Sequence, residues 1–171
     1  MDIWSKTKRS DVMSRIRSRD TKPELLVRSL LHRSGIRFSL CRKELPGRPD
    51  IVLPKYHAVV FVHGCFWHQH KGCAVASNPG TRKTFWQAKF KANVARDRRN
   101  WKQLEKQGWR VMVVWECDVT RDPHAVLAGL LDWLGGGRKF SCDYMPSRIA
   151  LLKVAEQKLQ WNLSHPFSSK T

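Results

Sequence analysis

Acidic residues are scarce in this sequence, whose 171 residues include 14 Asp and Glu against 32 Lys and Arg. The resulting formal net charge of +18 at pH 7 exceeds what solubility requires. It also has the sign that polyphosphates attract. We therefore expect nucleic acid to be the main partner.

Long apolar runs are missing as well. No stretch approaches the roughly eighteen continuous apolar residues of a membrane helix, and the opening MDIWSKTKRSD lacks the apolar region of a signal peptide. We expect a cytoplasmic protein without membrane contact. In that reducing compartment the five cysteines, an odd number, are better explained as metal ligands or buried small residues than as disulfides.

Turn residues and apolar periodicity predict the order of the elements. Thr21-Lys22-Pro23-Glu24 resembles a capping box and opens a helix that stops at Gly35. The remaining pattern predicts strands at 36–40, 50–53, 58–62 and 109–115, and helices at 84–107, from Asp122 to before Gly135, and at 147–161. This order, in a chain of the length and apolar content of one domain, predicts an α/β fold with a mixed central sheet flanked by helices.

Two basic segments are candidates for DNA contact. SKTKRSDVMSRIRSRDT, near the N-terminus, intersperses basic residues with Val12, Met13 and Ile16, which is typical of a short amphipathic helix or of an arm laid on DNA. From residue 82 to residue 110, ten Lys or Arg stand against two acidic residues. Such a run is consistent with a solvated helix face and equally with a DNA-facing surface.

The stretch HGCFWHQHKGC, residues 63–73, concentrates soft metal ligands. Cys65, His70 and Cys73 have the short spacing of a tetrahedral Zn²⁺ site. Cys117 follows a predicted strand that should neighbour strand 58–62, which makes it the candidate fourth ligand of a structural site. The alternative is that these cysteines are buried small residues and the histidines surface residues. The cysteines isolated from other ligands are assigned to that class: Cys41 and Cys142.

Aromatic residues surround the same ligands. Phe66 and Trp67 lie between the candidate zinc ligands, and Trp86 lies near the start of the basic helix. Apolar rings that insert between base steps unstack the duplex locally, and stacking of the rings on the bases can offset that cost. We therefore interpret these three rings as a wedge, whereas core packing is the interpretation for four other tryptophans, Trp101, Trp109, Trp115 and Trp133.

Asp50 is the candidate centre of a second metal site. It follows Gly-Arg-Pro at the start of a strand, and a second strand comes about ten residues later. This resembles the PD-(D/E)xK nuclease arrangement, in which the second strand normally brings Glu-x-Lys. Here the corresponding residues are Phe61-Val62-His63, which departs from a generic restriction enzyme. The plain alternative is that Asp50 only serves turn chemistry.

Several strings together resemble one family, the very-short-patch repair (Vsr) mismatch endonucleases of bacteria. They run in order from about residue 10 to residue 117 and include GRPD at 47–50, FVHGCFWH at 61–68, TFW at 84–86, RDRR at 96–99, GWRV at 108–111 and VWEC at 114–117. The resemblance implies a restriction-endonuclease-like fold with a structural zinc site. It also implies a Mg²⁺-dependent enzyme that nicks DNA beside the thymine of a T·G mismatch left by deamination of 5-methylcytosine.

The resemblance also implies roles for individual residues. Asp50 would be the principal Mg²⁺ ligand, with the backbone carbonyl of Val62 replacing the usual Glu oxygen. His68 would be the general base, and Asp97 would either orient it or order metal-bound water. Further residues would hold waters of the hydrated metal ions, namely Glu24 and His63. Zinc would be held by Cys65, His70, Cys73 and Cys117, and the bases would be approached by Phe66, Trp67, Trp86, Lys89, Asn93 and Met13.

Purely structural roles remain as alternatives for three of these residues. Glu24 also suits a helix cap, Asp97 suits a pair with a neighbouring arginine, and His68 suits an exposed loop. Two rival functions stay open too: a nuclease of the same superfamily acting on undamaged DNA, and a zinc-bearing DNA-binding module without catalysis.

The resemblance completes the expected organisation. Residues 1–20 would form a basic DNA-contacting segment, 21–135 the endonuclease domain, and 136–171 a variable C-terminal segment. We expect a monomer in the bacterial cytoplasm, associated with the nucleoid. Its expected partners are double-stranded DNA with a T·G mismatch and mismatch-repair proteins.

Overall fold

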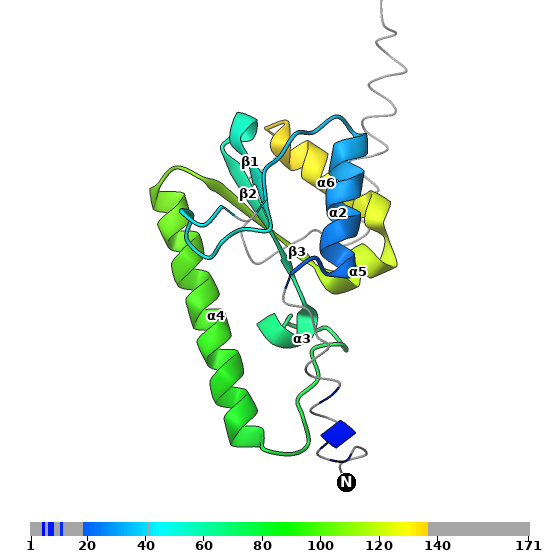
Figure 1. Cartoon of the computed structure of the whole chain (residues 1–171), viewed down its shortest axis with the longest axis vertical. Helices are drawn as coiled ribbons and strands as arrows, with labels where there is room; N and C mark the ends of the chain where they lie inside the picture. The colour runs from blue at the N-terminus through cyan, green and yellow to red at the C-terminus, as the bar shows by residue number, and fades with distance from the viewer. Residues whose placement is uncertain (1–4, 6, 9–10, 12–18, 41, 137–171) are drawn as a thin grey trace, which may run out of the picture.

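The computed structural model describes residues 5, 7–8, 11, 19–40 and 42–136 (Figure 1). The expectations for Met13, for Cys41 and Cys142, for the helix at 147–161 and for most of the N-terminal segment therefore lie outside the described residues. Among the described residues, no helix is long and apolar enough to cross a membrane.

A small mixed sheet forms the centre of the molecule. Its strands are β1 (Ile51–Leu53), β2 (Ala58–His63) and β3 (Arg110–Trp115), in the order β1-β2-β3. β1 pairs with β2 antiparallel, and β2 pairs with β3 parallel, with His63 opposite Trp115. The predicted mixed sheet and the predicted neighbourhood of β2 and β3 are thus confirmed.

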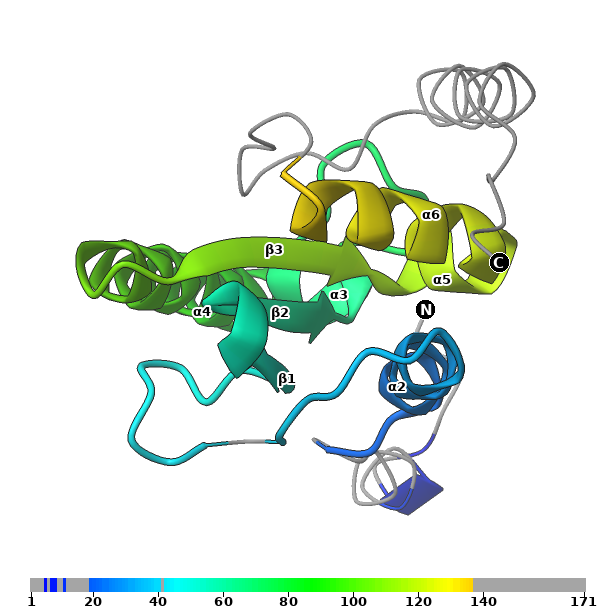
Figure 2. The same cartoon turned by 90° about the horizontal axis from the view of Figure 1, so that it is seen from above.

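Helices cover both faces of this sheet. The long helix α4 (Lys83–Lys106) lies along one face, and α2 (Lys22–Arg33), α5 (Glu116–Arg121) and α6 (Pro123–Leu134) lie on the other (Figures 1 and 2). Alternate strand residues point to opposite faces, so each sheet face builds its own apolar cluster. One cluster joins Val60 and Val114 to α2 and α6, and the other joins Phe61 and Val113 to Leu104 of α4.

The predicted helix starts are largely confirmed. α6 begins after Asp122, whose side chain accepts a hydrogen bond from the Ala125 N–H at 3.0 Å. α2 begins after Thr21, but the reciprocal capping box is wrong, because the Thr21 side chain makes no cap bond to the backbone. The Thr21 hydroxyl instead donates to Glu24, so the carboxylate of that residue is engaged inside the fold.

The strand predicted at 36–40 is wrong. Only Ser39 pairs, as an isolated bridge with Val52 in which each N–H donates to the other carbonyl at 2.8 Å. The apolar alternation has another cause, because Ile36 and Phe38 pack partly buried against the core without extending the sheet. Two short helices were not predicted, α3 (Cys65–His68) and α5, since a helix of one or two turns has no readable periodicity.

Candidate active site and metal centre

The edge of the sheet where β2 and β3 end carries the polar residues. Parallel strands bring their carboxyl ends to the same edge, so His63 at the end of β2 lies beside Trp115 at the end of β3. Gly64 then leads into α3 (Cys65–His68), which packs against α4.

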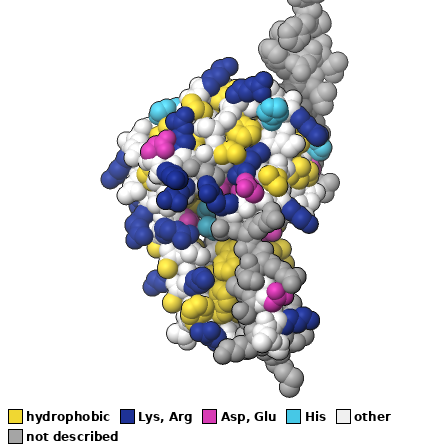
Figure 3. Space-filling view, in the orientation of Figure 1, with side chains coloured by type: hydrophobic (Ala, Val, Ile, Leu, Met, Phe, Trp, Pro, Cys, Tyr) yellow, Lys and Arg dark blue, Asp and Glu magenta, His cyan; other side chains and the backbone are white. Residues whose placement is uncertain are grey.

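One pocket at this edge gathers all five candidate catalytic residues. Its volume of about 710 Å³ lies within the range of substrate-binding clefts, and its lining includes Glu24, Asp50, His63, His68 and Asp97. Basic side chains also line it, Lys43, Arg48 and Arg96. In Figure 3, Lys and Arg side chains gather around the few acidic side chains visible at the centre of this face. The pocket thus offers acidic oxygens inside a cationic rim.

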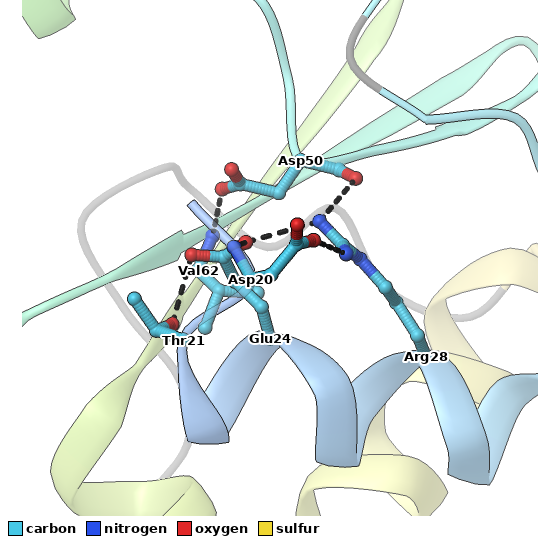
Figure 4. Close-up of polar contacts among 6 residues, drawn as sticks. All are labelled: Asp20, Thr21, Glu24, Arg28, Asp50 and Val62. Carbon is cyan, nitrogen blue, oxygen red and sulfur yellow. Dashed lines mark hydrogen bonds and ion pairs between the residues drawn. The ribbon is translucent and has the colours of Figure 1, made fainter. Parts of the chain in front are cut away.

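Asp50 accepts a hydrogen bond through Oδ2 from the backbone N–H of Val62 at 2.8 Å (Figure 4). Burial raises the pKa of the Asp50 carboxyl from 3.8 to about 6, and the charge of Glu24 adds to this effect. The bond from Val62 and the charges of Arg28 and His68 act in the opposite direction. A carboxylate in this situation is stabilised by a bound cation.

His68 and Asp97 form a dyad. The Nδ1 atom of His68 lies 2.5 Å from Oδ2 of Asp97, with the Asp97 side chain only 9% exposed. Burial acts to raise the pKa of Asp97, but the hydrogen bond and charge of His68, with smaller effects of His63 and Arg96, lower it. The carboxylate therefore stays ionised, binds the Nδ1–H of the imidazole and leaves Nε2 free to accept a proton.

His63 supports this dyad from the sheet side. Its ring stacks on that of His68 with centroids 3.7 Å apart and an interplanar angle of 15°. Burial, followed by the charge of His68, lowers the pKa of His63 to about 3, against an opposing effect of Asp97. His63 is therefore neutral, and its ring packs against the ring of His68.

Glu24 reaches the pocket from the first turn of α2 (Figure 4). It is 4% exposed, and its carboxylate accepts from the Thr21 hydroxyl at 2.8 Å and from the Asp20 N–H at 3.0 Å. A third donor is Arg28, one turn further along α2, at 3.0 Å. Sequence reasoning missed Arg28, although its spacing of four residues from Glu24 is that of a helical ion pair.

The candidate zinc ligands come together as one cluster. The ligand atoms of Cys65, His70, Cys73 and Cys117 all lie within 4.8 Å of one another. Nδ1 of His70 is 3.6 Å from the Cys65 sulfur and 3.3 Å from the Cys117 sulfur. In a tetrahedral zinc site with ordinary bond lengths, the edge between a sulfur and a nitrogen ligand is about 3.6 Å. The cluster therefore fits zinc.

Burial and charge make the cluster suited to a cation. Burial raises the pKa of the Cys65 and Cys117 thiols, so thiolates at these positions need a positive partner. The Trp115 ring links the two centres, because it stacks on His70 at 4.1 Å and 5° and presents an edge to His63 at 5.6 Å and 76°. The Glu116 carboxylate adds a hydrogen bond from the Cys65 N–H at 3.3 Å.

The three predicted wedge rings are also brought together. Phe66 lies 5.1 Å from Trp67 and 5.5 Å from Trp86, centroid to centroid, and all three rings are half-buried. The Lys89 ammonium lies 5.4 Å from the centroid of the Trp67 ring. Asn93 donates to the Trp67 carbonyl at 3.1 Å. The group has a further member that sequence reasoning did not assign, Phe85, which is 47% exposed.

The sequence is similar to proteins of one family. A family model described as "DNA mismatch endonuclease Vsr" matches residues 1–74. The type II nicking enzyme V.XorIIP of Xanthomonas oryzae pv. oryzae is 50% identical over 119 residues, which cover 70% of this chain and 87% of that protein. The type II nicking enzyme V.NmeAIP of Neisseria meningitidis is 48% identical over 118 residues, covering 69% and 84%. The DNA mismatch endonuclease Vsr of Escherichia coli is 47% identical over 116 residues, covering 68% and 74%.

Proposed function

This chain belongs to the Vsr DNA mismatch endonuclease family and is a DNA nicking endonuclease, and we propose that it nicks one strand of duplex DNA at a T·G mismatch. The mismatch would be the one that deamination of 5-methylcytosine leaves. The observation that carries the proposal is that two of the three rings, Phe66 and Trp67, lie on the short helix that also bears His68, with Trp86 of α4 packed against them. Recognition and hydrolysis would then act at a fixed separation on the duplex.

Asp50 and the backbone carbonyl of Val62 are proposed to hold Mg²⁺, with Glu24 near the same centre. Carboxylate and carbonyl oxygens are the ligands that this hard cation prefers. When bound, Mg²⁺ supplies charge stabilisation at the scissile phosphate. Because Oδ2 of Asp50 accepts from the Val62 N–H, the carboxylate orientation is set before any cation arrives.

His68 is proposed to take the proton of the attacking water. Asp97 holds the Nδ1–H of the ring, so the free Nε2 lone pair accepts that proton, and the resulting imidazolium is stabilised by the adjacent carboxylate. The neutral His63 ring keeps the base in place by stacking. The basic residues that line the pocket are placed to attract the DNA backbone.

Zinc is proposed as a structural ion at Cys65, His70, Cys73 and Cys117. Four protein ligands leave no open position, which is typical of structural sites. Residues 65–73 supply three of the four ligands and also carry the base and two of the rings, so zinc would fix this segment onto β3 and α5 through Cys117.

A second substrate class is favoured by the names of two relatives. V.XorIIP and V.NmeAIP are type II nicking enzymes, which leaves nicking of an undamaged site as the alternative. The test compares nicking of matched duplexes that carry T·G or C·G at one position, with and without Mg²⁺. Selective cleavage of the T·G duplex supports the proposal, and equal cleavage of both duplexes supports the alternative. Asp50→Ala should remove nicking while DNA binding persists.

A further inference from the structure

Arg28 is a buried cation at the back of the acidic centre. The residue is 7% exposed, and it sits on α2 in the row that also buries Val27 and Leu31. Unlike those neighbours it carries a charge, which is stable in such a place only when paired and hydrogen-bonded. What its guanidinium contacts therefore decides its role.

The guanidinium joins three segments (Figure 4). Nη1 lies 2.5 Å from Oδ1 of Asp20, just before the helix. Nη2 lies 3.0 Å from Oε2 of Glu24 and donates, at a longer 3.5 Å, to the backbone carbonyl of Asp50. One planar group thus ties the start of α2, the Glu24 carboxylate and the backbone of the candidate magnesium ligand.

Stability alone explains this arrangement poorly. Nε of Arg28 is buried and has no hydrogen-bond partner in the described part of the chain. A buried ion pair with an unsatisfied N–H is a weak stabiliser compared with an apolar side chain of the same volume. The guanidinium does orient its acceptors, because its planar N–H groups accept only a narrow range of acceptor directions.

We propose that Arg28 is a positioning residue, whose guanidinium orients the Glu24 carboxylate and the Asp50 backbone so that their oxygens converge on Mg²⁺. The inference rests on the proposed function, in which Asp50 holds the cation. Residues just outside a metal site typically change metal affinity or activity by about 10–100-fold when removed. We expect an effect of that size here.

Charge and geometry can be separated with two variants. Arg28→Lys keeps the positive charge but replaces the planar fork by a compact ammonium, which cannot span the carboxylates of Asp20 and Glu24 with the same geometry. Arg28→Met removes the charge and keeps an unbranched chain. If geometry is what matters, both variants weaken metal binding.

The direct test is metal binding by the DNA-free full chain, with Mn²⁺ as the probe and electron paramagnetic resonance as the readout. We expect Mn²⁺ affinity to fall about 10–100-fold in Arg28→Lys and in Arg28→Met. The Mg²⁺ concentration for half-maximal nicking should rise in parallel. Arg33→Met, which changes an exposed arginine at the end of the same helix, is the matched control and should bind Mn²⁺ as the wild type does.

Several outcomes would overturn the inference. Wild-type affinity in Arg28→Lys would show that charge suffices, and tighter binding in Arg28→Met would show that Arg28 acts only by repelling the cation. Should Arg28→Met fail to fold, as judged by circular dichroism, the lysine variant decides.

A double-variant cycle tests the path through Glu24. In a Glu24→Gln background, Arg28→Lys should cause little further loss of Mn²⁺ affinity, because the carboxylate that it orients is gone. A fully additive loss would contradict action through Glu24. A wild-type chain that does not nick T·G duplexes would defeat the proposed function, whereas normal nicking with unchanged Mn²⁺ affinity in the variants would defeat only the role of Arg28.

Discussion

Replacing Asp50 by asparagine should make the protein more stable at neutral pH while it removes nicking. The introduced amide can keep the hydrogen bond from the Val62 N–H through its side-chain oxygen, and it has the same shape as the carboxyl. It does not carry the negative charge that burial opposes. The wild-type carboxylate is therefore a source of instability that the cation would relieve.

The magnitude follows from the pKa. The Asp50 pKa lies at about 6 in the folded chain against an ordinary value of 3.8, so between these values the folded state binds more protons than the unfolded state. Stability then falls as the pH rises through this interval. At about 1.36 kcal/mol for each pH unit, the loss amounts to about 3 kcal/mol above pH 6. Well below pH 3.8 the carboxyl is protonated in both states, and the variant should equal the wild type.

The assay is urea unfolding of wild type and Asp50→Asn at several pH values from 4 to 8, with equal zinc content. The difference in unfolding free energy should grow from about 0.5 kcal/mol at pH 4 to about 3 kcal/mol at neutral pH. Millimolar Mg²⁺ should narrow this difference, because the cation stabilises only the chain that binds it. Glu44→Gln is the matched control: its side chain is 67% exposed, so solvent already stabilises the charge.

Two results would refute the reasoning. A variant less stable than the wild type at neutral pH would mean that the Asp50 charge is satisfied within the fold without metal. A stability difference that does not change with pH would mean that the substitution acts through packing.

Four further outcomes are expected. Lowering the pH through about 6 should reduce nicking by protonating Asp50, and more Mg²⁺ should move this loss to lower pH in rate profiles, because the cation competes with the proton. Asp97→Asn should lower the single-turnover nicking rate about 10²–10⁴-fold with DNA affinity unchanged, because the amide no longer holds His68 with Nδ1 protonated. Elemental analysis should find about one zinc ion per chain in the wild type and none in Cys117→Ala, and this variant should unfold at a lower temperature. Trp67→Ala should weaken binding to T·G duplex by about 1–3 kcal/mol in fluorescence titrations, because a stacking ring is removed, with a smaller change for C·G duplex.

The sequence predicted the framework of the site because that framework depends on local patterns. Two apolar runs of strand length indicated β2 and β3, and parallel pairing then placed Cys117 beside the loop that begins at His63. Cys65 and His70 were readable because ligand spacing within one short loop leaves few geometries. These inferences need only chain direction and residue type.

The remaining features depend on contacts between distant segments, which no local pattern encodes. An arginine in a basic chain is expected at the surface, so the sequence did not predict the burial of Arg28 beside Asp50. The alternation at 36–40 predicted the partial burial of Ile36 and Phe38 but not the exposure of Leu40, and it was wrong for pairing, because partial burial against the core produces the same pattern as an edge strand. The stacking of His63 on His68 likewise depends on how α3 turns back after Gly64.

The Trp115 ring stacks on His70 and presents its edge to His63, so one side chain contacts both the cysteine–histidine cluster and the candidate catalytic centre. Grafting residues 63–73 onto another scaffold would transfer most of the cysteine and histidine ligands without the Trp115 ring, and so without the contact that positions His63 relative to the candidate zinc ligands. Residues 63–73 therefore depend on the scaffold that surrounds them. Substitutions in this loop should be tolerated only where they preserve the packing against Trp115, a residue that is itself a ligand of neither centre.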